Sequence, residues 1–240
     1  MPKNKSTLIL DVGAGSIKAG FHNEKEPSFN RIIDNCIFKA KNVSNKTYIG
    51  SELNDCNNLS GMFLFLPFKK GYINNWELEK QILDYTMKEM FDKKNTTLEE
   101  TNVIFTEPMF NFSSTRETIQ EIFFEEYQCN GLILTSAPFL TDFKHRIRRK
   151  NEWSLIIDSG YSFTTFIPMH NGIPLYECRF VIPEILFHPS DVGYNEMGMV
   201  EAISYILNEL VPENGKVDCY DNIVLSGGSC CFPGFKERLF

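Results

Sequence analysis

Two short stretches of this chain carry residues that are suited to hold a phosphorylated ligand. In each, an apolar run ends in an aspartate and a glycine follows two residues later: Asp11 with Gly13, and Asp158 with Gly160. A carboxylate at a strand end suits Mg²⁺ held through water molecules, because this ion prefers oxygen ligands. Backbone N–H groups in a tight turn suit phosphate oxygens. The pattern predicts a Mg²⁺–phosphate site that is built twice, although two ordinary hairpins with glycine-bearing turns would also give it.

Two further features add to this pattern. Lys18 follows the first turn and would place a compact positive charge against phosphate. Gly227 and Gly228 lie at a predicted strand-to-helix turn, where they would let a flat ligand approach the backbone. An unusually tight turn explains this glycine pair equally well.

The apolar, β-type runs on both sides of each turn predict the elements that position these residues. Each turn leads into a second β-type run, at residues 16–21 and 163–167, so neither turn is a dinucleotide-binding fingerprint that opens a helix. Neither is a Walker A loop, because no Gly-Lys-Ser/Thr follows. The repeated order of strand, aspartate, glycine and strand predicts an α/β protein with a duplicated core, whose halves face each other across a cleft. We place the two domains at residues 1–150 and 151–240.

The rest of the chain predicts several elements around these turns. A helix is expected after Asn75, which suits its N-cap. Two more helices are expected from Ser113 or Ser114 and over residues 200–210, the last stopped by Pro212 and Gly215. Composition predicts three other segments: an exposed polar loop at 41–60, buried core at 62–68, and a solvated loop, rather than a nucleic-acid patch or localisation signal, at the basic cluster 144–150.

The overall composition bounds the function. The 240 residues are 42% hydrophobic and 23% charged, as in an ordinary soluble globular protein, and the net charge of −7 argues against a whole-surface nucleic-acid binder. The apolar runs are too short to span a bilayer, and the N-terminus lacks the apolar core of a signal peptide. The seven cysteines show no zinc spacing, so reduced thiols are expected.

With these motifs the sequence resembles the actin superfamily and, within it, the actin-related protein 6 family. Asp11-Val12-Gly13-Ala14-Gly15 is similar to the first phosphate loop of actins. Ile157-Asp158-Ser159-Gly160 is similar to the second phosphate loop, and Leu225-Ser226-Gly227-Gly228 is similar to the adenosine loop. The subfamily resemblance rests mainly on residues 107–112, 158–164 and 181–193. It implies a duplicated ribonuclease-H-like fold, the actin-like ATPase fold.

The resemblance also implies a set of ligand contacts, if nucleotide binds. Hydrated Mg²⁺ would be held by Asp11 and Asp158. Phosphate would be held by Lys18 and by the backbone of Gly13, Ala14, Gly15, Ser159 and Gly160. Adenine would be bordered by Gly227 and Gly228.

Several departures from the actin pattern change the expected function. Where actins carry the glutamine that positions the attacking water, this chain has Ala137, followed by Pro138. Tyr161 stands where actins carry an aspartate in the second phosphate loop. The short polar stretch 41–60 is unlike the longer insertion through which actin subunits contact one another. These differences predict no hydrolysis and no filaments, and the lack of the family's upper subdomain, which closes over the base, predicts weak or absent ATP binding.

The second half is expected to be incomplete. Between Tyr176 and Phe180 the family normally places a helix, an upper subdomain and further strands, which this sequence lacks. Family members also continue with helices beyond the position of Phe240. A splice form, an error in the gene model or a partial chain would each account for these absences.

The family resemblance implies a non-enzymatic role in the nucleus, with some protein in the cytoplasm. The expected role is a subunit of an SWR/SRCAP-class chromatin remodeller, which exchanges a histone for its variant. Its partners would be remodeller subunits and, indirectly, histones, with no membrane and no sequence-specific nucleic acid. The alternatives are a working Mg-ATPase of the superfamily of actins, heat-shock chaperones and sugar kinases, and a polymerising cytoskeletal protein.

Overall fold

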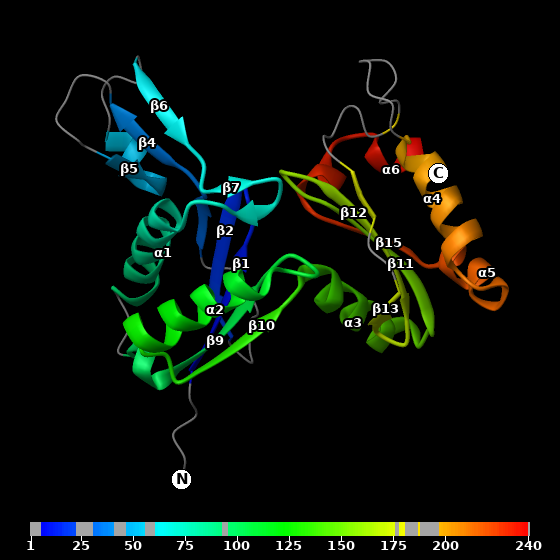
Figure 1. The fold of residues 1–240 in the computed structure, drawn as a ribbon, viewed down its shortest axis with the longest axis horizontal. Coiled ribbons are helices and arrows are strands. Elements are labelled where there is room, and N and C mark those ends of the chain that lie inside the picture. Colours follow the sequence, from blue (N-terminus) through cyan, green and yellow to red (C-terminus); the bar gives the residue numbers. More distant parts are fainter. Residues whose placement is uncertain are drawn as a thin grey trace, which may run out of the picture. The chain divides into compact units, whose positions relative to one another are not determined.

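A computed structural model describes residues 6–22, 31–40, 47–55, 61–92, 96–175, 178–180, 187 and 197–239. The chain divides into two compact units, Met1–Thr135 and Ser136–Phe240 (Figure 1). The segment 136–150 therefore belongs with the second unit. Family-specific residues 181–186 and 188–193 lie outside the described residues.

The first unit is built on a five-stranded mixed sheet in the order β10-β9-β1-β2-β3. Strand β1 pairs antiparallel with β2 and parallel with β9, and β10 continues the parallel side. The strands are β1 (Ser6–Val12), β2 (Ser16–Phe21), β3 (Arg31–Asp34), β9 (Thr101–Thr106) and β10 (Gly131–Thr135). The first predicted hairpin is confirmed, with its turn between Val12 and Ser16.

Helices α1 and α2 pack against this sheet and close the core of the first unit. Alternate residues of β1, namely Leu8, Leu10 and Val12, are buried in that core, so the intervening Asp11 lies on the opposite face. Asn75 caps α1, as predicted, by accepting a hydrogen bond from the Leu78 backbone N–H at 3.1 Å. The helical elements are η1 (Gly50–Asp55), α1 (Trp76–Phe91), η2 (Leu98–Glu100), α2 (Ser113–Glu121) and its π-helical continuation η3 (Ile122–Glu126).

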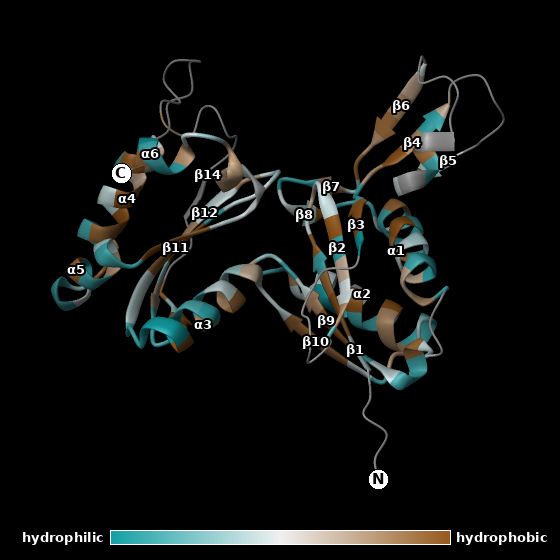
Figure 2. Ribbon diagram, turned by 180° about the vertical axis from the view of Figure 1, so that it is seen from behind, coloured by the Kyte–Doolittle hydropathy of each residue, from teal (hydrophilic) through white to brown (hydrophobic). Residues whose placement is uncertain are grey.

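A small three-stranded sheet in the order β5-β4-β6 corrects two predictions. The segment 41–60 is not a plain loop, because its described part forms β5 and η1. The segment 62–68 is not buried core. Phe63 and Leu64 are neighbours in the edge strand β6 and point to its opposite faces, yet they are 52% and 51% exposed, so no layer of the described residues covers either face here (Figure 2). These strands and the hairpin that follows are β4 (Ile37–Ala40), β5 (Thr47–Ile49), β6 (Met62–Phe65), β7 (Phe68–Lys69) and β8 (Tyr72–Ile73).

The second unit has a sheet in the order β13-β12-β11-β15, with β14 also paired to β12. Strand β11 pairs antiparallel with β12 and parallel with β15. The strands are β11 (Trp153–Ser159), β12 (Thr164–His170), β13 (Ile173–Pro174), β14 (Cys178–Phe180) and β15 (Ile223–Ser226). The helical elements are α3 (Ala137–Arg149), α4 (Met199–Tyr205), η6 (Ile206–Leu210), α5 (Glu213–Asp221), η7 (Gly228–Cys231) and α6 (Phe235–Leu239).

Both faces of β11 are covered. Trp153, Leu155 and Ile157 are buried against α4, η6 and α5. On the other face, the hydroxyl of Ser154 donates to the carboxylate of Asp142 on α3 at 2.6 Å. Strand β11 is buried at every position except Asp158 and is therefore the central element of this unit.

The helix predicted over residues 200–210 is confirmed by α4 and η6, but two other predictions in the second unit were wrong. The cluster 144–150 is no loop, because residues 144–149 form the last turns of α3. The Ser136 hydroxyl caps that helix and its basic residues suit the negative C-terminal end of the helix dipole. Gly215 does not end a helix but lies inside α5, where an added Cβ would strike the indole of Trp153. The absent side chain lets α5 approach β11 closely.

The duplicated α/β core is confirmed, since each unit contains an antiparallel hairpin with a parallel strand beside its first strand. In the first unit these strands are β1, β2 and β9, and in the second they are β11, β12 and β15. No helix among the described residues is long and apolar enough to cross a membrane.

Candidate functional site

The first predicted carboxylate is held from both sides. Asp11 lies opposite Lys18 in the β1–β2 register, and their side chains form an ion pair of 2.9 Å. The other carboxylate oxygen accepts a hydrogen bond of 2.9 Å from the Thr106 hydroxyl. That hydroxyl in turn accepts from the Val12 backbone N–H at 3.0 Å. Thr106 was not predicted to be a site residue, because only the parallel pairing of β9 brings it beside Asp11.

The tip of the first hairpin is closed by a hydrogen bond of its own. The Gly13 N–H donates to the Ser16 carbonyl at 3.1 Å, so this N–H is engaged within the turn. A Cβ on Gly13 would lie 3.1 Å from the same carbonyl oxygen, which explains the preference for glycine. Ala14 and Gly15 complete the turn.

Asn35, which follows strand β3, holds the tip of the first hairpin through hydrogen bonds. This role was not predicted from the sequence. Its side-chain amide donates to the Gly13 carbonyl at 3.0 Å, and its backbone N–H donates to the Gly15 carbonyl at 3.1 Å. Asn35 is fully buried, as is Glu79 on α1, which accepts a long hydrogen bond of 3.4 Å from the same amide. Burial raises the pKa of Glu79 from 4.5 to about 8.

The second hairpin repeats the turn of the first. The Gly160 N–H donates to the Phe163 carbonyl at 3.0 Å, at the same spacing as in the first turn. In the β11–β12 register Asp158 lies opposite Thr165, at the position that Lys18 holds opposite Asp11. The second hairpin therefore offers a buried hydroxyl where the first offers a cation.

The double-glycine turn packs directly on the second hairpin. Gly227 has a φ of 90°, and an added Cβ would overlap the backbone of Ser159. The buried Ser229 hydroxyl donates to the Gly160 carbonyl at 3.1 Å. The structure thus brings together Ser159, Gly160 and Gly227, which the sequence had marked separately.

A thiol that the sequence did not mark as a site residue lies in the same place. Cys230 donates to the Ser226 carbonyl at 2.9 Å. Burial raises the pKa of this thiol to about 11, with a smaller contribution from the Asp158 carboxylate. Cys230 is therefore a neutral donor at physiological pH rather than a reactive thiolate.

The two departures from the actin pattern have clear structural positions. Ala137 is the first residue of α3, directly after the cap Ser136, and its methyl group offers no hydrogen bond. Tyr161 lies in the second turn with its side chain 66% exposed, so it fills no pocket in this unit.

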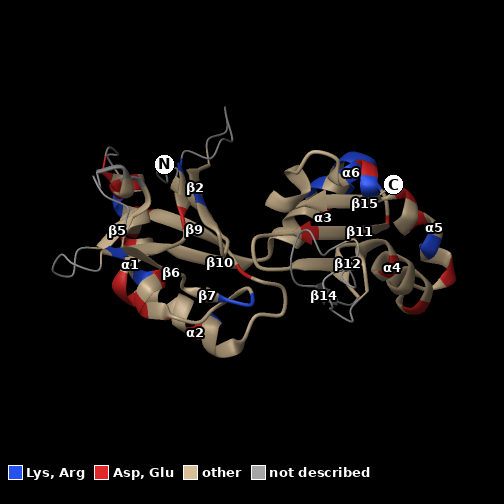
Figure 3. Ribbon diagram, turned by 90° about the horizontal axis from the view of Figure 1, so that it is seen from above, with Lys and Arg blue, Asp and Glu red and all other residues tan. Residues whose placement is uncertain are grey.

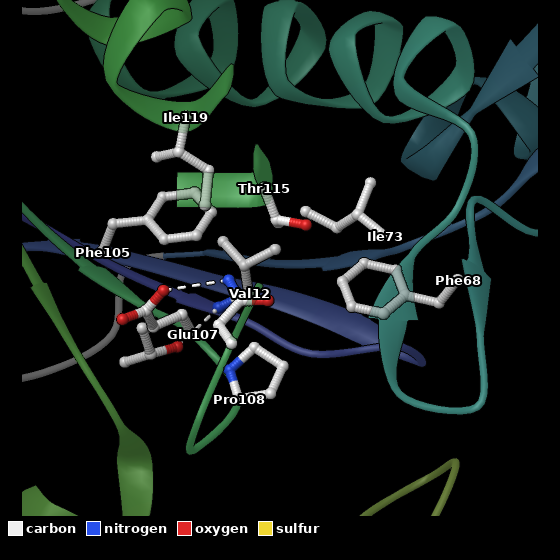
Figure 4. Close-up of a pocket in the computed structure, with 10 residues that line it drawn as sticks. Val12, Phe68, Ile73, Phe105, Glu107, Pro108, Thr115 and Ile119 are labelled. Atoms are coloured by element: carbon white, nitrogen blue, oxygen red, sulfur yellow. Dashed lines mark hydrogen bonds between the residues drawn. The ribbon is translucent and has the colours of Figure 1, made fainter. Parts of the chain in front are cut away.

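A small cavity lies beside the first hairpin, where β9 ends (Figure 4). Its lining includes Val12, Thr106, Glu107 and Asn111, and it has room for about one water molecule. Glu107 is buried and forms an ion pair with Arg116 at 2.7 Å, while Asn111 donates to it at 2.9 Å. This cavity is too small for a nucleotide, and its carboxylate is already neutralised.

The fit of Mg²⁺ can be judged from the donor groups. The described residues contain no group of three or more His, Cys, Asp or Glu side chains that would ligate a metal directly. Both oxygens of Asp11 are hydrogen-bonded. These residues fit only an ion that keeps its water shell and is held at a distance. Asp11 belongs to the first unit and Asp158 to the second.

Comparison with known proteins agrees with the duplicated fold. The family model described as Actin matches residues 3–178 and 173–240. The chain is 25% identical to actin-related protein 6 of Drosophila melanogaster, covering 98% of this chain and 84% of that protein. It is 35% identical to actin-related protein 6 of Neurospora crassa and 30% identical to that of Dictyostelium discoideum, over 71% and 69% of this chain but only 40% and 37% of those proteins.

These matches confirm the predicted resemblance and the predicted gap. The alignment with the Drosophila relative spans 341 positions, more than the 240 residues of this chain, so that protein has segments that this chain lacks. The two blocks matched by the family model meet at residues 173–178, where the sequence predicted missing structure. The second half of the fold is incomplete relative to those proteins. With the family model covering both units and both phosphate-loop hairpins in place, this chain belongs to the actin family.

Proposed function

We propose that this chain is a non-enzymatic, scaffold-type subunit of an SWR/SRCAP-class chromatin-remodelling complex, located in the nucleus with some protein in the cytoplasm. The proposal is supported by the similarity to proteins named actin-related protein 6 in an insect, a fungus and an amoeba. Its partners are remodeller subunits, and histones are contacted only indirectly. Neither a membrane nor a specific nucleic-acid sequence is a partner.

The observation that carries the non-enzymatic part is the makeup of the second hairpin. Hydrolysis of a phosphate bond needs a group that orients or deprotonates the attacking water. Opposite Asp158 the chain presents Thr165, whose hydroxyl is not a base at physiological pH, and at the start of α3 it presents the methyl group of Ala137. These residues support a protein that has kept the framework of the hairpins without a hydrolytic group.

Weak or absent ATP binding is part of the same proposal. The Lys18 ammonium is paired with Asp11, and the Gly13 N–H is engaged with the Ser16 carbonyl. A nucleotide would have to compete with both interactions. The chain also lacks a segment between the two blocks that match the family.

Titration calorimetry with Mg²⁺-ATP tests this part directly. We expect no heat of tight binding with the full chain, and no difference for a chain with Asp11→Asn. Tight, Mg²⁺-dependent binding that Asp11→Asn abolishes would contradict the proposal.

The scaffold role is tested by assembly. A purified SWR-class complex depleted of its own actin-related protein 6 should take up this chain in co-purification, and its histone exchange should recover. The Asp158→Ala variant should support exchange equally well, because the role does not need a nucleotide. No uptake by the depleted complex would overturn the scaffold proposal.

A working Mg-ATPase is the second candidate, and it is favoured by the equivalent positions of Asp11 and Asp158 in the two hairpins. It predicts steady phosphate release from ATP that disappears with Asp158→Ala. A polymerising cytoskeletal protein predicts salt-induced sedimentation, which we do not expect.

A further inference from the structure

Two buried oxygens at the base of the first hairpin have no hydrogen-bond partner among the described residues. They are Oδ1 of Asn35 and Oε2 of Glu79. Both residues are fully buried, and a buried polar atom without a partner costs folding free energy. The two oxygens belong to groups that already share a hydrogen bond, from Asn35 Nδ2 to Glu79 Oε1. A single proton between them would satisfy both atoms.

The orientation of the Asn35 amide is fixed by its other contact. Nδ2 lies 3.0 Å from the Gly13 carbonyl, which can only accept a hydrogen bond. The amide nitrogen must therefore face Gly13, and the oxygen Oδ1 cannot take its place. Because Oδ1 can only accept, its missing partner must be a donor.

Among the described residues, no positive charge of the neighbouring elements forms an ion pair with Glu79. Strand β2, which packs on α1, carries Lys18, but its ammonium is bonded to Asp11. On β3, Arg31 pairs with Glu89, and Asp34 is acidic. The thiol of Cys36 has a pKa raised to about 11 by burial and by Asp34, so it is neutral.

Helix α1 carries both acidic and basic residues (Figure 3), and those nearest to η3 are paired with one another. Lys80 pairs with Asp84 and Glu126, and the Tyr127 hydroxyl donates to Asp84 at 2.7 Å. The pKa of Tyr127 is raised by burial and by its acidic neighbours, of which Glu79 is one, so the phenol is neutral. An ionised Glu79 would be a buried carboxylate without a compensating charge, which is costly.

We infer that Glu79 is a neutral carboxylic acid in the folded protein, and that its Oε2–H donates to Asn35 Oδ1. Together with the bond from Asn35 Nδ2 to Glu79 Oε1, this closes a two-bond acid–amide pair. The pair positions the first hairpin, because the same Asn35 holds the Gly13 and Gly15 carbonyls. Asn35 and Glu79 are positioning residues for the tip, and this role does not depend on nucleotide binding or on the proposed scaffold function.

A pH dependence with a defined sign follows. The pKa of Glu79 is about 8 in the folded chain, against an ordinary value of 4.5. Folding therefore takes up a proton between these two values. The stabilisation from the protonated acid is fully present below pH 4.5, falls as the pH rises, and is lost above pH 8. Within this window the folding equilibrium constant should fall about tenfold per pH unit from this group alone.

The Glu79→Gln variant tests the pair, because a glutamine amide can donate to Oδ1 at every pH. Denaturant unfolding of the full chain is measured between pH 5 and pH 8 for wild type, Glu79→Gln and the control Glu77→Gln. Glu77 is exposed in the same first turn of α1, so Glu77→Gln makes the same chemical change at a carboxylate that stays in solvent. We expect the free energy of unfolding of wild type to fall more steeply with pH than that of Glu79→Gln, by the amount that one bound proton contributes. Glu79→Gln should be the more stable protein at pH 8, and Glu77→Gln should keep the wild-type pH dependence.

Two further measurements separate this pair from a merely structural role. Infrared spectroscopy at pH 7 should show a protonated carboxylic acid in wild type that is absent from Glu79→Gln. Hydrogen exchange at Ala14 and Gly15 should become faster in Asn35→Ala, which cuts the link to the tip. Parallel pH slopes for wild type and Glu79→Gln, or no acid band at pH 7, would overturn the inference.

Discussion

At the scale of single residues, the glycines of these turns differ in how strictly they are required. A Cβ on Gly13 would lie 3.1 Å from the carbonyl oxygen that the turn's own N–H binds, which is tight, whereas a Cβ on Gly160 would make an ordinary contact of 3.6 Å. At Gly227 the backbone has a φ of 90°, and the space for a side chain is filled by the backbone of Ser159. The second case is the stricter one, because neither strand can move without breaking the sheet.

Replacing Gly227 should therefore be far more harmful than replacing its neighbour. We expect Gly227→Ala to destabilise the second unit by about 3 kcal/mol, through overlap with Ser159 and a strained φ. Gly228→Ala should change stability by less than about 0.5 kcal/mol, because nothing lies within 4 Å of its Cβ position. Thermal unfolding of both variants measures the difference. Equal effects would show that the two loops are not packed as described.

At the scale of elements, the start of helix α1 could be predicted from local residues, whereas the exposure of strand β6 could not. Helix α1 starts after Asn75 as predicted, because an N-cap acts on residues within one turn. Strand β6 has an apolar sequence and was predicted to be buried, yet it is an exposed edge strand. No local pattern in β6 says whether another layer covers it.

The cap of α1 can be tested with a neighbouring asparagine as control. Asn75→Ala removes the acceptor of the Leu78 N–H and should cost about 1 kcal/mol. Asn74→Ala should be close to neutral, since its exposed side chain is not the cap. Urea unfolding of the two variants compares them. A larger loss in Asn74→Ala would mean that the helix begins one residue earlier than described.

At the scale of the whole molecule, each unit buries a hydrophobic core of its own. The first core is closed by α1 and α2, and the second by α4, η6 and α5. The two sets of buried residues have no member in common. Unfolding is therefore not expected to be a single two-state transition.

Truncation of one core should lower one transition only. Ile82→Ala in α1 and Ile157→Ala in β11 each remove a fully buried side chain and should cost about 3 kcal/mol. In calorimetry, Ile82→Ala should shift the transition of the first unit, and Ile157→Ala that of the second. If each variant shifts the entire unfolding profile, the units fold as one cooperative body and this prediction is wrong.

The sequence by itself determined the two hairpins and their similarity to each other. Asp11 with Gly13 and Asp158 with Gly160 are local patterns, because the residue order of a tight turn fixes where its carboxylate and glycine lie. The duplicated α/β core followed from their repetition. The gap in the second half followed from the family resemblance.

Tertiary structure alone decided which other groups meet these turns. Thr106 reaches Asp11 through parallel pairing, Asn35 and Glu79 meet beneath the first tip, and Ser229 reaches Gly160 from the double-glycine turn. These partners are separated by 95, 44 and 69 residues along the chain. Such contacts depend on strand order and helix packing, which local residue patterns do not encode.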